Sequence, residues 1–259
     1  MTETFVEPRP FGVVGFGTNV LDLVGAAFPP ASHEEHTVKL YLNSCEPAEV
    51  KEIAQWGILD GVTMNPTMVA AIHRDYVQNL KEICALGNLD VFAQVVSEGA
   101  DRMVEEAKAL AAIHPRVIVK VQTNAEGVQA IGRLKQAGIR TCATAIHSTL
   151  EAIAAGRAGA DHAAIFIGLL GEVDETPPDR LIAMIREIYD QHAIPTQIMA
   201  AVRSASQLVQ SLASGADEIT APFSVWKLFF QNSHTLARWS SFVSNWRKAY
   251  GDRNWLTGY

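Results

Sequence analysis

VIVKVQT, residues 117–123, places Lys120 in the middle of an apolar, β-branched run. Pro115 precedes the run and Asn124 follows it, as is typical of a short strand that is buried on both faces. Burial disfavours the charged ammonium and lowers its pKa, and an amine that is neutral near about pH 7 attacks a carbonyl to form a Schiff base. The alternative is a lysine at a strand end whose ammonium extends into solvent.

Similar β-like runs recur on both sides of this one, from residue 38 onward. They are VKLYLNS at 38–44, GVTMN at 61–65, DVFAQVV at 90–96, RTCATAI at 140–146, HAAIFIG at 162–168, PTQIMAAV at 195–202 and EITAP at 218–222. Between them lie segments with apolar residues at helical spacing and a glycine at the C-terminal end, such as AEGVQAIGRLKQAG. Strands that alternate with helices in this way predict an α/β fold, a parallel (β/α)8 TIM barrel. An open doubly wound sheet is the alternative, although it usually needs fewer units.

The predicted barrel covers residues 38–232 and leaves a segment on either side. Residues 1–37 contain FGVVGFGTNVLDLVG, whose G-x-G is weak support for nucleotide binding. We expect an N-terminal extension that packs on the barrel or on a neighbouring subunit. Residues 233–259 are expected to form a C-terminal helix and tail. The helix carries a broad apolar stripe formed by Leu236, Trp239, Phe242, Val243 and Trp246. The stripe predicts a contact in a homo-oligomer, and packing against its own barrel is the alternative.

Composition and charge exclude several classes of protein. The chain has 259 residues, a formal net charge of -7 and 48% hydrophobic residues, which suits a large core and argues against nucleic-acid partners. No apolar run reaches the roughly 18 residues of a membrane span, and the N-terminus has no basic region before an apolar signal core. We therefore expect a cytoplasmic protein with no membrane partner. Cys45, Cys84 and Cys142 have no metal-ligand spacing, so we expect them to be packing cysteines. We also expect no metal and no cofactor.

Polar side chains recur at the C-terminal ends of the predicted strands, where a barrel builds its active site. They are Asn43 and Ser44, Thr63 and Asn65, Gln94, Lys120 and Gln122, and Thr144. Amides, hydroxyls and one amine that converge in this way suit a small polyhydroxylated carbonyl substrate. Taken singly, Asn65 before Pro66 is also a strand terminator, and Thr144 is also a good strand former.

The strings KLYLNS, GVTMNP, FAQV, VIVKV, the TAI within RTCATAI, and AGAD, in this order, resemble the transaldolase family. The resemblance is greatest to its short branch, which contains fructose-6-phosphate aldolase, and it covers roughly residues 38–251. It implies that Lys120 forms the Schiff base and that Asn65 positions substrate hydroxyls. It also implies that Gln94 and Thr144 hold a water that shuttles protons, and that subunits assemble as pentamers or decamers.

The resemblance implies a class I transaldolase or aldolase that acts on a small ketose or aldehyde. The Lys120 amine would add to a ketone and lose water, and the resulting iminium would accept the electron pair of the breaking carbon–carbon bond. Protonation of the enamine gives an aldolase, and its addition to another aldehyde gives a transaldolase. The alternative is a repurposed, non-catalytic barrel that merely binds a carbonyl ligand.

Several positions depart from the family pattern. Asn43 replaces an aspartate, and an amide cannot accept the proton of a substrate hydroxyl. Phe166 replaces the tyrosine of the aldolase branch, which favours transfer over simple protonation. Leu169 and Val202 stand where the family has an arginine and a serine, which leaves Arg203 one position out of register. Phosphate needs several charge-assisted donors, so we expect an unphosphorylated substrate. The alternative is that Arg203 still reaches a phosphate.

Overall fold

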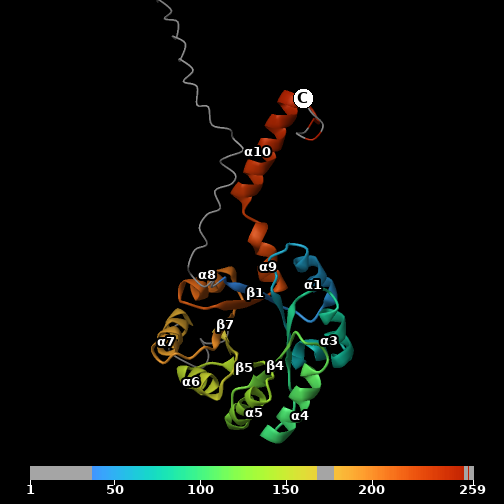
Figure 1. The fold of residues 1–259 in the computed structure, drawn as a ribbon. Coiled ribbons are helices and arrows are strands. Elements are labelled where there is room, and N and C mark those ends of the chain that lie inside the picture. The colour runs from blue at the N-terminus through green and yellow to red at the C-terminus, as the bar shows by residue number, and fades with distance from the viewer. Residues whose placement is uncertain (1–36, 168–177, 254–255, 257–259) are drawn as a thin grey trace, which may run out of the picture. The chain divides into compact units, whose positions relative to one another are not determined.

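The strands form a closed parallel barrel in which each strand pairs with the next and β8 pairs with β1 (Figure 1). The structure is a computed structural model that describes residues 37–167, 178–253 and 256. The strands are β1 (Lys39–Asn43), β2 (Gly61–Thr63), β3 (Asp90–Gln94), β4 (Val117–Gln122), β5 (Thr141–Ile146), β6 (His162–Ile165), β7 (Gln197–Ala201) and β8 (Glu218–Pro222). The predicted (β/α)8 barrel is confirmed, and the open sheet is wrong because both edges of the sheet are paired.

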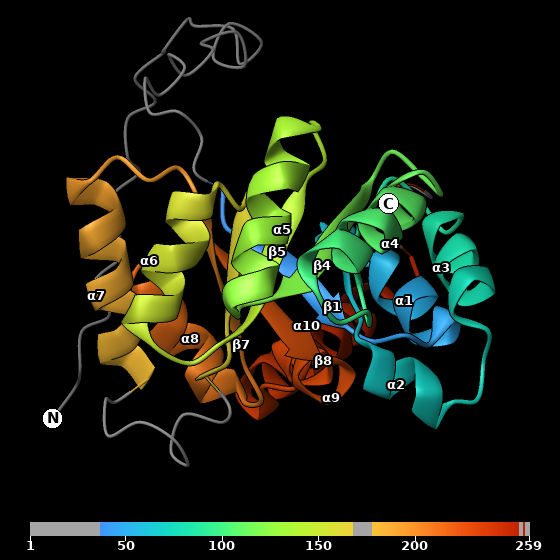
Figure 2. The same ribbon diagram turned by 90° about the horizontal axis from the view of Figure 1, so that it is seen from below.

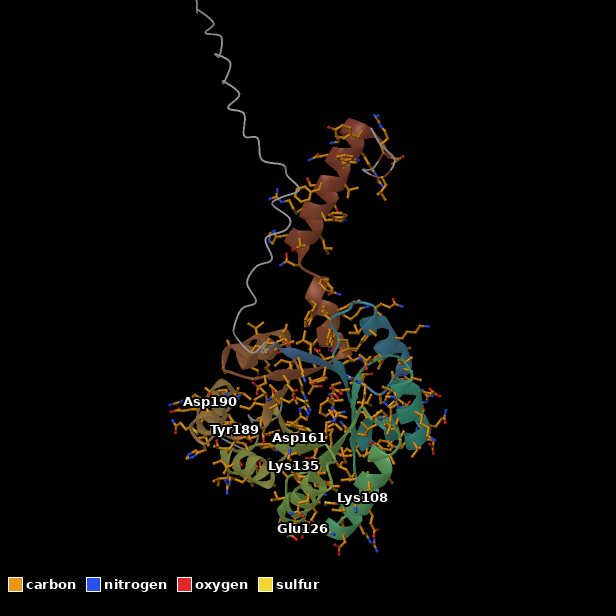
Figure 3. All side chains as sticks on the ribbon, in the orientation of Figure 1. Lys108, Glu126, Lys135, Asp161, Tyr189 and Asp190 are labelled. Carbon is orange, nitrogen blue, oxygen red and sulfur yellow. The ribbon has the colours of Figure 1, made fainter. Side chains whose placement is uncertain are left out.

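Helices connect the strands and form a ring around them (Figure 1). Those between strands are α1 (Pro47–Ala54), α2 (Pro66–Ala71), α3 (Tyr76–Cys84), α4 (Ala100–Ala111), α5 (Ala125–Gln136), α6 (Thr149–Ala158), α7 (Pro178–Gln191) and α8 (Ala205–Ala213). After β8 come α9 (Phe223–Trp226), the 3₁₀ turn η3 (Lys227–Phe230) and α10 (Ser233–Tyr250). Helices α4 to α7 stand side by side around the barrel (Figure 2). Ion pairs such as Lys135 to Asp161, with Nζ 3.1 Å from Oδ1, lie on this outer side (Figure 3).

Two apolar cores lie on opposite faces of the strands. The larger core fills the layer between strands and helices, and in β4 it includes Val117, Val119 and Val121. The smaller core contains Tyr41, Phe92, Ile118, Cys142, Ala164 and Met199, with Phe166 packed against it. Because side chains alternate along a strand, Ile118 and Lys120 share the face of β4 that points into the barrel.

A buried polar network lies inside the barrel and joins the middle of β1 to the first residues of β6 and β8. The Tyr41 hydroxyl donates to Glu218 Oε1 at 3.1 Å, and His162 Nδ1 lies 2.8 Å from Glu218 Oε2. Glu218 has no solvent-exposed surface. A buried carboxylate is tolerated only when it has partners, and Tyr41 and His162 supply them for Glu218. The sequence patterns did not reveal this network.

Helix α10 has no buried residues. Leu236, Trp239 and Phe242 are 53%, 66% and 57% exposed, so the alternative that the stripe packs on its own barrel is not what the structure has. Figure 1 shows the helix projecting from the barrel. Within the described residues, no helix is long and apolar enough to cross a membrane. Residues 1–36 of the expected extension, and Trp255 and Tyr259 of the tail, lie outside the described residues.

Candidate active site

Lys120 is buried inside the barrel, with 6% of its surface exposed. Burial lowers the pKa of its amine, and the neighbouring Cys142 acts in the opposite direction. Burial also raises the pKa of the Cys142 thiol, to about 12, so this neighbour is uncharged. Lys120 Nζ donates to the Met64 carbonyl at 3.3 Å, and no ion pair joins it to any described carboxylate. The environment therefore favours the neutral amine, and an ammonium that extends into solvent is excluded.

A cavity of about 120 Å³ opens beside the lysine at the C-terminal ends of the strands. Its walls come from strands on both sides of the barrel: Asn43, Thr63, Asn65, Lys120, Ala164, Phe166, Met199, Ala201, Val202, Arg203 and Thr220. Lys120 and Arg203 are the basic residues among them, and none of the described residues that line this cavity is acidic. The cavity therefore brings Lys120 together with the predicted Asn43, Thr63, Asn65, Phe166 and Arg203.

Asn43 belongs to a chain of polar contacts along one wall of this cavity. The Thr63 hydroxyl donates to Asn43 Oδ1 at 3.4 Å and lies 2.5 Å from the Thr220 hydroxyl. One proton order fits both contacts, in which Thr220 donates to Thr63 and Thr63 donates to the amide oxygen. Asn43 Nδ2 then remains available as a donor to a substrate oxygen. The amide can bind a substrate hydroxyl but cannot take its proton.

Asn65 ends a strand and also lines the cavity, so both interpretations of its sequence position fit the structure. Its Oδ1 accepts from the Met68 N–H at 3.0 Å and caps the N-terminus of α2, which begins at Pro66. This contact ends β2 at Thr63, two residues before the predicted end. Because the oxygen is occupied by the helix, the amide nitrogen is the group left to contact a ligand in the cavity.

A second cavity of about 700 Å³ adjoins the first at the ends of β2 to β5. Asn65 and Phe166 line both cavities. The predicted Gln94 and Thr144 line the second cavity, together with Gln122. Thr144 is fully buried, and its hydroxyl has no hydrogen-bond partner among the residues that the structure describes. A buried hydroxyl without a partner is rare in native proteins, so this atom is placed to bind a water or a substrate group.

The backbone of β5 is irregular beside Thr144. The β5–β6 register shifts between Ala143 and Ile146, and Ala145 has a φ of 60°. A left-handed conformation is costly for a residue with a Cβ and is found at functional sites. His147 Nδ1 lies 2.8 Å from the Ala145 carbonyl, and its ring contacts Phe166 edge-on with centroids 5.6 Å apart. The bulge therefore lies at the wall of the larger cavity, which Ala145 lines.

Three positions bear on phosphate binding: Arg203, Val202 and Leu169. Arg203 is exposed and lines the smaller cavity beside Val202, and its backbone N–H donates to Gln207 Oε1 at 2.8 Å. Leu169 lies outside the described residues.

The structure adds residues that the sequence patterns missed. Thr220, Met199, Ala164 and Ala201 also line the smaller cavity. The two-residue strand period is the signal that could have found them, since each lies on the inward face of its strand.

The three cysteines are buried and free. Within the described ranges, no group of three His, Cys, Asp or Glu side chains is placed to hold a metal ion.

Known proteins with similar sequences cover almost the whole barrel. Residues 40–251 match the model of the transaldolase/fructose-6-phosphate aldolase family. The chain is 38% identical over 210 residues to a probable transaldolase of Alkaliphilus metalliredigens, covering 81% of this chain and 98% of that protein. It is 35% identical over 215 residues to a probable transaldolase of Symbiobacterium thermophilum, covering 83% of this chain and 99% of that protein.

A solved structure shows a likeness of fold alone. The recombinant flavin-binding domain of baker's yeast flavocytochrome b2 has a TM-score of 0.53 and 11% identity, over 72% of this chain and 56% of that chain. The sequence match, in contrast, runs from β1 through α10 and includes Lys120 with its cavity. The chain therefore belongs to the transaldolase/fructose-6-phosphate aldolase family and is an enzyme of that family.

Proposed function

We propose that this enzyme makes or breaks a carbon–carbon bond in a small ketose-like substrate through a Schiff base on Lys120. The observation that carries the proposal is a lysine that is 6% exposed, has its pKa lowered by burial and lines a cavity of polar residues. Its neutral amine adds to the ketone carbon, and loss of water gives an iminium. The iminium then accepts the electron pair of the adjacent carbon–carbon or carbon–hydrogen bond and becomes an enamine.

Proton transfer in this scheme belongs to the neighbouring cavity. The free Thr144 hydroxyl and Gln94 line one wall, and a water bound between them would carry protons to and from the reacting carbon and oxygen. Asn43 and Asn65 would hold substrate oxygens with their amide nitrogens.

Phe166 offers no hydroxyl to the enamine, which supports addition to a second aldehyde over simple protonation. The proposed reaction is therefore closer to that of a transaldolase than to that of an aldolase, which protonates the enamine and releases the ketone.

Borohydride trapping tests the covalent step. The protein is incubated with dihydroxyacetone or with candidate ketoses and then reduced, and peptide mass spectrometry locates the adduct. We expect the label on Lys120 and none in Lys120→Met. Lys135→Met is the matched control, because Lys135 is an exposed lysine paired with Asp161 on the outside of the barrel. Turnover of a ketose and an aldehyde must accompany trapping, since a binding-only lysine also forms an imine. A label on another lysine during turnover would refute the assignment.

We further propose that the enzyme works as a homo-oligomer, a pentamer or decamer, in the cytoplasm. Support for assembly comes from α10, on which Leu236, Trp239 and Phe242 are more than half exposed and which carries an apolar groove lined by Trp239, Phe242, Val243 and Trp246. Soluble proteins seldom expose so much contiguous apolar surface, and a second copy of this chain would cover it. The three free, buried cysteines suit a reducing compartment.

A further inference from the structure

The larger cavity differs from the smaller one in charge. Among the described residues that line it, none is charged, and the apolar ones include Met68, Val95, Val96 and Phe166. The basic residues of the site, Lys120 and Arg203, line the smaller cavity. Because Asn65 and Phe166 border both cavities, a substrate bound covalently to Lys120 can extend into the larger one. That part of the substrate would meet apolar surface, amides and the Thr144 hydroxyl.

The wall that carries Val96 is held in place by two side chains from neighbouring helices. Strand β2 ends at Thr63, so the backbone of Gln94 has no strand partner on that side. The Tyr76 hydroxyl takes the place of the missing strand: it accepts from the Gln94 N–H at 2.7 Å and donates to the Gln94 carbonyl at 3.1 Å. This fixes the end of β3 at the floor of the larger cavity.

A carboxylate continues this support beyond β3. Both oxygens of Glu106 accept from the Val96 N–H, at 3.0 and 3.1 Å, and Oε2 also accepts from the Ser97 N–H at 2.8 Å. Val96 follows the end of β3 and lines the larger cavity together with Gln94, and 63% of it is exposed. An apolar side chain is therefore held rigidly at the rim of the cavity, a common feature of sites that bind apolar ligand groups.

The described lining of the larger cavity offers no cation to a phosphate. A phosphate dianion there would lose water without the charge-assisted donors that it requires, and the Glu106 carboxylate that binds the Val96 backbone adds a like charge nearby. An uncharged alkyl or aryl group would instead bury apolar surface against Val95, Val96 and Phe166.

We infer that this larger cavity is a subsite for an uncharged, largely apolar substituent, and that the enzyme prefers neutral apolar aldehydes to phosphorylated ones. The inference rests on the proposed Schiff base at Lys120. It concerns the class of substrate, whereas the Schiff base concerns the reaction.

The test compares two aldehyde acceptors with one donor. With dihydroxyacetone as the donor, kcat/KM is measured for 3-methylbutanal and for glyceraldehyde 3-phosphate. We expect kcat/KM to be about tenfold or more higher for 3-methylbutanal than for glyceraldehyde 3-phosphate. The reason is that the phosphate would be bound without a cationic partner in the larger cavity.

Val96→Lys then places a cation at the rim and should lower this preference about tenfold or reverse it. Val209→Lys is the matched control, because Val209 lies on α8 and is 64% exposed, against 63% for Val96. It should leave the preference unchanged. Arg203→Ala should also leave the neutral acceptor favoured, since Arg203 lines the other cavity.

The outcomes separate this inference from the proposed reaction. Borohydride trapping of dihydroxyacetone on Lys120 is measured in the same samples. No adduct overturns the Schiff base and the inference together. An adduct that is accompanied by a preference for the phosphorylated aldehyde, by no turnover of either aldehyde, or by equal effects of Val96→Lys and Val209→Lys overturns the inference alone. A phosphate preference that collapses in Arg203→Ala would place the phosphate in the smaller cavity.

Discussion

Tyr76→Phe removes one oxygen atom that makes two hydrogen bonds to the backbone of Gln94, at 2.7 and 3.1 Å. Burial raises the pKa of Tyr76 to about 12, so its hydroxyl is protonated and able to donate under ordinary assay conditions. Without it, a half-buried N–H and carbonyl lose their partners, which costs about 1–3 kcal/mol. For a domain of this size, each kcal/mol lowers Tm by roughly 2–4 °C.

The same substitution should also affect turnover. The end of β3 carries Gln94, and a shift of about 1 Å in a positioning group costs up to roughly 10²-fold in rate. We expect kcat to fall more than tenfold, while borohydride still traps the donor on Lys120 because that lysine is untouched.

Tyr189→Phe is the control for the stability effect. The Tyr189 hydroxyl donates to the Ala152 carbonyl at 2.6 Å, on the α6–α7 side of the barrel (Figure 3). Its loss should lower Tm by a similar amount and leave kcat unchanged. Differential scanning calorimetry and steady-state kinetics on both variants give the comparison. Equal effects of the two substitutions on kcat, or a fall in the Tm of Tyr76→Phe without a loss of turnover, would show that Tyr76 is a structural residue only.

Four further predictions concern the site and α10. Asn43→Asp supplies the missing proton acceptor and should raise ketose cleavage by about 10²–10⁴; equal or lower activity across all donors would show that the amide serves recognition instead. Because burial lowers the pKa of Lys120, imine formation should reach its plateau below the ordinary lysine pKa of about 10.4. Lys120→Met should stabilise the unliganded fold most at low pH and least as pH rises toward that value, since the buried ammonium is then lost; a pH-independent effect in denaturant titrations argues against this. Trp239→Asp with Phe242→Asp should shrink the oligomer in light scattering without unfolding the barrel, and a monomeric wild type would contradict the proposed assembly.

The fold could be predicted from the sequence because each barrel strand is buried on both faces. Runs such as VIVKV and HAAI are almost continuously apolar, and the intervening helices are amphipathic. The predicted ends were less accurate where a side chain ends the strand. Strand β2 stops at Thr63 since Asn65 caps α2, and a strand pattern cannot distinguish that asparagine from a last strand residue.

The site could be predicted only as a set of inward-facing residues. Alternation along a strand gives the face on which a residue lies, but it does not give the depth in the barrel or the partner across it. The Tyr76 contact to Gln94 spans 18 positions, and that between Glu218 and His162 spans 56. The first contact depends on how α3 packs on β3, and the second depends on how the strands are staggered around the closed barrel. The division into a cavity with basic residues and one without charged residues depends on the same stagger.

The position of the lysine within its strand explains why one residue combines burial with access to substrate. Two residues earlier, Ile118 lies in the closed apolar core of the barrel, where an amine would meet no ligand. Two residues later, Gln122 is only half-buried and lines the larger cavity, where an amine would be better hydrated and more basic. The odd positions Val119 and Val121 face the helices. Position 120 alone in β4 is buried enough to lower the pKa of an amine and still borders the smaller cavity. The reactivity proposed for Lys120 would therefore follow from its depth in the barrel, with no need for a charged neighbour.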